Sequence, residues 1–397
     1  MNPFPKPIYK DSPHFQNFWT KGNGKKLIDW TGAKVSFDNY EKFATNFYKV
    51  DELGDAVVKE IYFTKSYPEA AAEIENYIKN TVSAEDEIPE SAKNLFLQTQ
   101  EIPDWVDYEL MEAGAELCRR VGIDALISLR DYSLMGGYDY AHLNKPLIAT
   151  GLLKKGAMKR LSDTLEFWIN VTRENALQLH GKGYESCIKI RMIHSYARLS
   201  IKKHQPDWNT ENWGEPINQW DMMATYGGFS LIILHSLKLL GHDISEKEEA
   251  GTFLLWKYVG YLLGISPELM AENKKEAVEN FYLWTSVQPS ADKDSIQLAK
   301  SLLNESLENP MLKFKPQREF LKYLHICCTH FLLDKETCER LEIPQVKNRM
   351  WFPKSRIFYN KNIRSLIPRK KQIARGNKEQ EQVLVDYLKF KNNVKNH

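Results

Sequence analysis

The stretch Cys187-Ile-Lys-Ile-Arg-Met-Ile-His-Ser-Tyr-Ala-Arg-Leu-Ser-Ile-Lys-Lys203 predicts the helix around which the chain is organised. It contains no glycine or proline, and it is long enough for about four helical turns. Arg191, His194 and Arg198 stand at positions i, i+3 and i+7 and therefore share one face, which is otherwise largely apolar. An imidazole on an apolar face between two guanidinium groups suits a buried site for an anionic, metal-bearing ligand. The alternative is a core histidine between two surface arginines.

The composition is that of an ordinary folded protein. The chain has 397 residues, enough for two average domains or one large one, with 43% hydrophobic and 27% charged residues. Aromatic residues make up 12%, which predicts a large interior lined by rings. The net charge of +2 is too small to indicate nucleic acid as a partner.

The sequence also argues against export and against a membrane span. The N-terminus has no apolar signal region. The two most apolar windows, 227–241 and 252–265, are shorter than the roughly 20 residues that a span needs, and each contains a lysine. We interpret both as core helices and expect a cytoplasmic protein. The odd number of cysteines, five, then favours reduced thiols.

Helical patterns dominate the chain from about residue 40, and alternating strand patterns are nearly absent. The sequence therefore predicts an all-α protein with one large helical domain. Residues 1–95 are interpreted as an N-terminal strap (irregular up to residue 40) with helices packed on the core, and residues 96–340 as the core. Residues 341–397 are rich in Lys and Arg and are predicted to be a solvated basic arm. The alternative for this arm is peripheral contact with an anionic surface such as a membrane.

Most cofactor motifs are missing. The chain has no phosphate-binding Gly-x-x-x-x-Gly-Lys-Ser/Thr loop, no Cys-x-x-Cys pair and no His-Glu-x-x-His. No histidine follows a glutamate by three residues, so a di-iron carboxylate site is not supported. His325, Cys327, Cys328 and His330 are spread around a helix axis, and His235 fits a core histidine better than a ligand.

His194 remains as the candidate ligand, and a single imidazole without carboxylate partners is a common proximal ligand for haem. Arg191 and Arg198 would then face the haem propionates.

Three segments together resemble the family of latex clearing protein (rubber oxygenase) and its MpaB-type relatives. Arg191-Met-Ile-His-Ser-Tyr-Ala-Arg198 is similar to the family's Arg-x-x-His-x-x-x-Arg signature. Arg160-Leu-Ser-Asp-Thr164 resembles its Arg-x-x-x-Thr helix, and the segment 216–230 resembles its Asn-Gln-x-Asp segment. Weaker likeness lies in 105–107 and 114–120. The resemblance covers roughly residues 95–335.

The resemblance implies a globin-like helical core that binds haem b, with His194 as the iron ligand. It also implies cleavage of a C=C bond in an isoprenoid-like, lipophilic alkene by O2. Arg160 and Thr164 would lie on the distal side, where a guanidinium can stabilise charge that develops on dioxygen. One position departs from the family pattern: Asp163 stands where polymer-cleaving members have a lysine that can bind the iron. It could be a weak ligand, a proton relay or a surface partner of Lys159 or Arg160.

Asp163 makes rubber a less suitable substrate than a smaller lipophilic alkene. Two other interpretations stay open at the level of the sequence. One is a non-catalytic protein of the same fold that binds haem or a lipophilic ligand. The other is a helical interaction protein in which His194 is structural and the basic arm docks to a partner.

Overall fold

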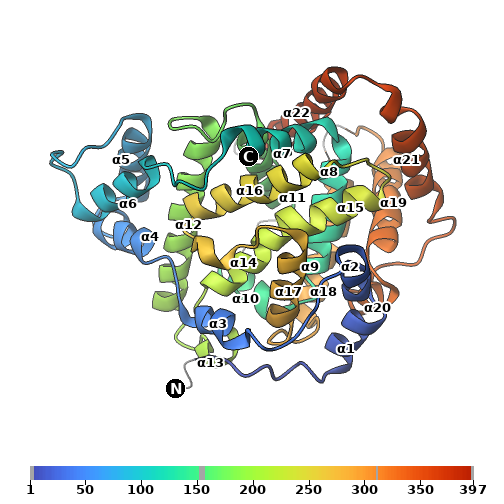
Figure 1. Ribbon diagram of the computed structural model, residues 1–397, viewed down its shortest axis with the longest axis horizontal. Coiled ribbons are helices and arrows are strands. Elements are labelled where there is room, and N and C mark those ends of the chain that lie inside the picture. The colour runs from blue at the N-terminus through green and yellow to red at the C-terminus, as the bar shows by residue number, and fades with distance from the viewer. Residues whose placement is uncertain (1–3, 152–156, 310–311, 395–397) are drawn as a thin grey trace.

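The protein is helical throughout the residues that its computed structural model describes, 4–151, 157–309 and 312–394 (Figure 1). These residues contain no β-strand, which confirms the prediction of an all-α protein with one helical domain. None of the helices in the described ranges is long and apolar enough to cross a bilayer. The cytoplasmic location stays a prediction.

The N-terminal part forms short helices, namely α1 (Pro13–Thr20), α2 (Asn23–Thr31), α3 (Tyr40–Ala44), η1 (Thr45–Tyr48), α4 (Glu52–Val57), η2 (Val58–Tyr62), α5 (Tyr67–Lys79) and α6 (Glu90–Gln100). The prediction that residues 1–40 are irregular is therefore wrong for α1 and α2. Their prolines and glycines mark helix ends: Pro13 begins α1 behind the Ser12 cap, and Gly32 ends α2 with a φ of 68°. Between these ends, Trp19 and Leu27 are buried in the core.

The middle of the chain contributes most of the helices, namely α7 (Tyr108–Arg120), α8 (Ile123–Ile127), η3 (Ser128–Leu134), α9 (Met135–Gly137), α10 (Ala141–Ala149), α11 (Ala157–Thr172), α12 (Lys182–His204), α13 (Thr210–Trp213), α14 (Gln219–Gly227), η4 (Gly228–Ile232), α15 (Ile233–Leu239), α16 (Glu246–Leu262), η5 (Pro267–Leu269), α17 (Lys274–Thr285), α18 (Lys293–Asn304), η6 (Glu305–Glu308), α19 (Lys315–Leu332) and α20 (Lys335–Arg340). The predicted central helix is α12. Asp107 caps α7 by accepting a hydrogen bond from the Leu110 amide.

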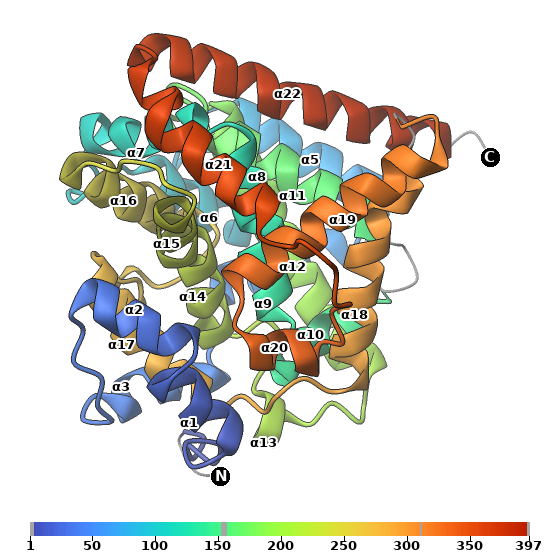
Figure 2. The same ribbon diagram turned by 90° about the vertical axis from the view of Figure 1, so that its right-hand side faces the viewer.

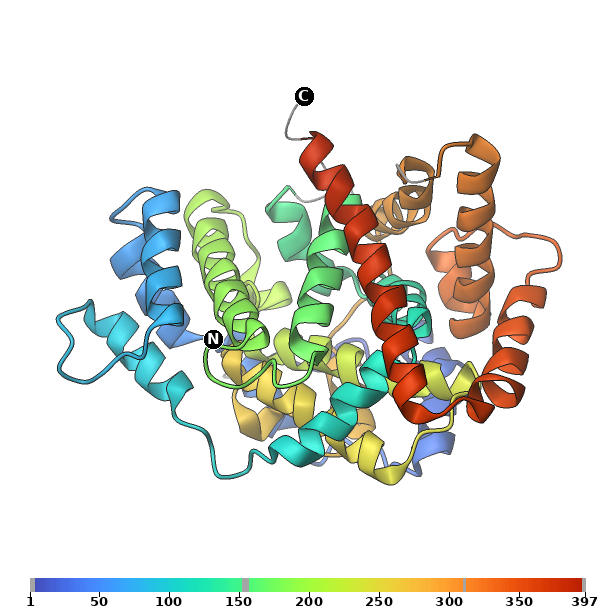
Figure 3. The same cartoon turned by 90° about the horizontal axis from the view of Figure 1, so that it is seen from above.

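The C-terminal part consists of α21 (Trp351–Asn362), η7 (Arg364–Leu366) and α22 (Arg369–Val394). It is not the solvated arm that its basic composition predicted, because α22 packs along α7 and α11. Figure 3 shows α22 beside α11, with α12 on the other side of α11. Gln380 is fully buried and donates to the carbonyls of Cys118 and Gly122. The last residues, 395–397, lie outside the described ranges.

One large hydrophobic core joins the N-terminal helices to the middle of the chain. It extends from Phe15 in α1 through Trp168 in α11 and Ile188 in α12 to Val278 in α17. All five cysteines are buried thiols.

Two π-helical segments, η3 and η4, pack against each other in the middle of the molecule. Ser133 donates to the carbonyl of Gly228 over 3.1 Å. A Cβ at position 228 would lie 2.6 Å from the Ser133 Oγ, so a larger residue there would displace this hydroxyl from its hydrogen bond. π-Helical turns are frequent at functional sites, and both segments line the cavity described next.

Candidate functional site

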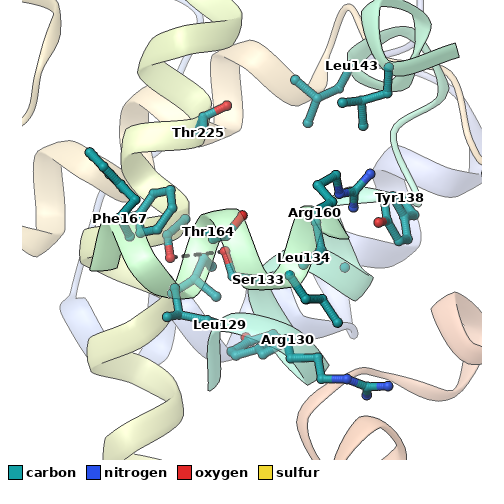
Figure 4. Close-up of a pocket in the computed structure, with 18 of the residues that line it drawn as sticks. Leu129, Arg130, Ser133, Leu134, Tyr138, Leu143, Arg160, Thr164, Phe167 and Thr225 are labelled. Atoms are coloured by element: carbon teal, nitrogen blue, oxygen red, sulfur yellow. Dashed lines mark hydrogen bonds between the residues drawn. The ribbon is translucent and has the colours of Figure 1, made fainter. Parts of the chain in front are cut away.

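A cavity of about 1070 Å³ is lined by residues of several elements, which include η3, α9, α10, α11, α12, α14, η4, α16, α19, α21 and α22. Its volume is at the upper end of the roughly 300–1,000 Å³ that is usual for small-molecule sites. Most of the wall is apolar, and rings are prominent: Phe229 and Trp256 stack with centroids 4.7 Å apart, and Phe167 lies beside them. Figure 4 looks into the open centre of this cavity.

His194 lies in the wall of the cavity, as the resemblance implied for a ligand. Neither ring nitrogen has a hydrogen-bond partner among the described residues, and Nδ1 is shielded from solvent. Burial lowers the pKa of His194 to about 4, with a smaller contribution from the nearby Arg198 cation. At neutral pH the imidazole is uncharged, which is the form that binds a metal.

Arg191, one turn before His194, is buried and forms a bidentate pair with Asp51, which caps α4. Both N–H···O distances are 2.7 Å. The close approach of the backbone at Gly264 completes this contact, since a Cβ there would lie 2.8 Å from Nε of Arg191. The guanidinium is not part of the cavity wall.

Arg198, one turn after His194, is buried in the same way. Its Nη2 donates to Asp55 over 2.7 Å and to Ser195 over 3.0 Å, and its Nη1 donates to the carbonyl of Ile217 over 2.9 Å. Ile217 has a φ of 54°, which is strained for a β-branched residue. The bond from Arg198 helps to hold this conformation, and the Ile217 side chain lines the cavity.

The structure therefore corrects the interpretation of both arginines as surface residues. It also places their guanidinium groups against Asp51 and Asp55, so in this structure they are not presented to a ligand in the cavity. Asp51 and Asp55 were not singled out in the sequence, although two acids one turn apart match two arginines on a crossing helix. The two pairs fix α12 to α4.

Arg160 on α11 is the cavity-lining arginine without an ion pair among the described residues. Its guanidinium lies 5.2 Å from the ring centre of Tyr138, and Nη2 is buried without a hydrogen-bond partner. Burial lowers the pKa of Arg160 to about 10, so the group is still charged at neutral pH. Figure 4 shows Arg160 beside Tyr138 at the edge of the open space.

Thr164 lies one turn after Arg160 on α11, and both side chains line the cavity (Figure 4). Asp163 also reaches the wall, but it pairs with Lys159 over 2.8 Å, and 43% of its side chain is exposed. The Lys159 pair was one of the three roles that the sequence left open for Asp163.

The segment that resembles Asn-Gln-x-Asp turns the chain into α14. The Asn218 side chain caps that helix by accepting from the Asp221 amide, and it donates to the Asp221 carboxylate over 2.7 Å. Burial raises the pKa of Asp221 to about 6, although the carboxylate also accepts from Nε1 of Trp284. Gln219 bridges to Gly264 and Ser266. Gln219 thus holds the backbone at Gly264, which contacts Arg191, and the Asn218 cap fixes the chain directly after Ile217.

A second polar cluster, which reaches the cavity wall through Arg130, His325 and Tyr387, was missed in the sequence. His325 Nδ1 lies 2.8 Å from Asp131, Arg130 binds Asp131 and Glu305, and Tyr387 donates to Glu305 over 2.6 Å. These residues come from η3, η6, α19 and α22, so no local spacing could reveal the cluster. The described residues contain no group of three or more His, Cys, Asp or Glu side chains that could hold a metal ion.

Comparisons with known proteins agree with the residue patterns. The sequence profile of the family described as ER-bound oxygenase mpaB/B'/Rubber oxygenase, catalytic domain, matches residues 119–360. A structure titled "Structure of Latex Clearing Protein LCP in the closed state" is similar in fold, with a TM-score of 0.64 over 91% of this chain and 95% of that chain, at 16% identity. No curated protein sequence matches significantly. Because the profile covers more than half of the chain, the protein belongs to the mpaB/B' and rubber oxygenase catalytic-domain family.

Proposed function

We propose that the protein is a haem b-dependent oxygenase that cleaves a C=C bond of a hydrophobic, isoprenoid-like substrate with O2. The observation that carries the proposal is the uncharged, unpaired imidazole of His194 in the wall of a large apolar cavity. Family membership supports an oxygenase in general terms. The choice of haem b, the substrate class and the roles of the residues are our proposal.

The residues of the cavity fit haem b in three respects. His194 offers Nε2 as a proximal ligand from a helix that two buried ion pairs hold in place. The aromatic wall is apolar, as a porphyrin requires. The unpaired Arg160 is available to a carboxylate or to a bound oxygen. Arg191 and Arg198, predicted as propionate partners, are positioning residues for α12 in this proposal, because Asp51 and Asp55 already neutralise them.

When bound, haem b supplies an iron centre at which O2 reacts with the substrate double bond. The chain's own residues do the rest. Arg160 holds a positive charge in a site with little water, where it stabilises negative charge more strongly than in solution. Thr164 presents a hydroxyl on the same face of α11. Phe167, Phe229 and Trp256 exclude water and give a lipophilic chain an apolar surface.

Absorption spectroscopy tests the proposal directly. Purified protein titrated with haem should develop a Soret band, and His194→Ala should lose it while its thermal unfolding stays cooperative. Exposed His204 on the same helix provides the matched control, His204→Ala, which should bind haem like the wild type. If the wild-type protein carries no Soret absorption after it is mixed with haem and separated from the unbound haem by gel filtration, the proposal is overturned.

The haem-loaded protein should then convert an isoprenoid panel with O2 into carbonyl products, detected as hydrazones. Haem binding without products from any member of the panel would instead support the alternative, a non-catalytic haem or lipophilic-ligand binding protein. The surface pairing of Asp163 with Lys159 is compatible with either outcome.

A further inference from the structure

Helices α19 and α21 lie on the side of the molecule that faces the viewer in Figure 2. On these helices and the turn η7 that follows, several large apolar side chains are exposed. We call this group the α21 patch, and it consists of Phe320, Trp351, Phe358, Ile363 and Leu366. The Phe358 side chain is 62% exposed and that of Leu366 82% exposed. Phe320 stacks on Trp351 with centroids 6.4 Å apart, and Phe358 lies two turns after Trp351 on the same helix face. Five large exposed apolar side chains within two neighbouring helices and the turn after them are more than the scattered single residues of an ordinary surface, and such groups mark contacts with a partner or a membrane.

The chain around this patch is strongly basic. Residues 345–375 contain no Asp or Glu and ten basic residues, namely Lys347, Arg349, Lys354, Arg356, Lys361, Arg364, Arg369, Lys370, Lys371 and Arg375.

The arginines and the lysines in this segment have different surroundings. Arg356 and Arg369, for example, pair with Asp124 and Glu248 in the body of the protein. None of the five lysines forms an ion pair within the described part of the chain, and all five are exposed. Arg356, Arg364 and Arg369 fasten α21 and α22 to the core. The five lysines leave positive charge on the surface of the same segment.

We propose that the α21 patch is a docking surface for an anionic lipid bilayer. Interfacial segments combine bulky apolar side chains, which enter the boundary of the acyl chains, with lysines that contact the head groups. A cluster of roughly four to eight Lys and Arg residues is typical of sites that bind acidic lipids. Nucleic acid is the weaker alternative, since bases stack on aromatic rings but make no such use of Ile363 and Leu366.

The same helices also contribute to the cavity wall. Leu321 and Leu324 follow Phe320 on α19, Phe352 follows Trp351 on α21, and all three line the cavity. A docked protein would therefore hold this part of the cavity wall close to the bilayer. That a lipophilic substrate enters there from the membrane rests on the proposed function, whereas the docking itself does not.

Vesicle flotation with the full-length protein tests the docking without any need for activity. The protein should float with phosphatidylcholine vesicles that contain phosphatidylserine, but not with phosphatidylcholine alone, and high salt should release it. Replacing Lys347, Lys354 and Lys370 by glutamine should weaken the partition by about 100-fold at low salt. Phe358→Ser with Leu366→Ser should weaken it by about tenfold or more, with little dependence on salt.

A matched control separates this surface from charge in general. Lys34, Lys42 and Lys59 are exposed lysines outside the α21 patch, and replacing all three by glutamine should leave flotation unchanged. Equal loss in both triple variants would overturn the proposal, as would binding to a single-stranded oligonucleotide without binding to the anionic vesicles. Normal flotation of a haem-free protein would leave docking supported even if the oxygenase proposal failed.

Discussion

Helices α11 and α12 pack against each other and line the same cavity, but their arginines have different surroundings. On α12, Arg191 and Arg198 are turned away from the cavity and neutralised by Asp51 and Asp55. On α11, Arg160 is in the wall, and its guanidinium has a tyrosine ring as a neighbour but forms no ion pair with a carboxylate of the residues that the structure describes. The arginines on the two helices therefore differ in role. On α12, Arg191 and Arg198 fix the helix that carries His194, whereas on α11 the positive charge of Arg160 is available to a ligand.

The comparison predicts that loss of Arg191 affects stability most. Arg191→Met leaves Asp51 as a buried, unpaired carboxylate, so the free energy of unfolding should fall by about 3–5 kcal/mol in urea titrations. The double variant Arg191→Met with Asp51→Leu should recover much of this loss. The control is Lys202→Met. Lys202 lies on the same helix as Arg191, and its exposed pair with Glu215 should contribute less than about 1 kcal/mol to the free energy of unfolding. Similar losses in the two single variants would show that the buried pair has no special role.

Arg160→Met should reduce activity and leave stability nearly unchanged. Its removal leaves no carboxylate unpaired, so the free energy of unfolding should change by less than about 1 kcal/mol. The rate of carbonyl formation should fall about 100- to 1,000-fold, because a buried charge aimed at the reacting atoms is lost. Lys182→Met, at an exposed position of α12 outside the cavity wall, is the control and should keep most of the activity. A stability loss as large as that of Arg191→Met would contradict the contrast between the two helices.

His194 should make stability depend on pH. Its pKa is about 4 in the folded protein and about 6.5 in the unfolded chain. The unfolded chain therefore binds more protons between these values, and stability should fall as the pH drops through this range, by up to about 1.4 kcal/mol per pH unit from this group. His194→Gln should reduce that slope in urea titrations at successive pH values. His204→Gln is the control, and an equal reduction in that variant would rule out His194 as the source.

The sequence predicted α12 and the shared face of its three residues because both depend on local spacing. The partners of Arg191 and Arg198 are about 140 residues earlier in the chain, so their burial depends on how α4 crosses α12 and could not be predicted from spacing. Composition was misleading at both ends. At the N-terminus, proline and glycine suggested irregular structure but mark the ends of α1 and α2. At the C-terminus, the many basic residues suggested a solvated arm, although α22 packs on the core through residues such as the buried Gln380.

Asp163 should give the smallest effect, and it decides how far the distal helix resembles its polymer-cleaving relatives. Asp163→Asn removes the exposed pair with Lys159, which is worth less than about 1 kcal/mol. If the carboxylate is only a surface partner, the Soret maximum and the rate of product formation should both stay within about twofold of the wild type. Asp163→Lys provides the sharper comparison, since it restores the residue type expected from the family and should shift the Soret maximum if position 163 reaches the iron. A shifted spectrum in Asp163→Asn, with unchanged thermal stability, would instead assign the carboxylate a role at the haem, so that α11 would present two polar groups to the ligand, Arg160 and Asp163.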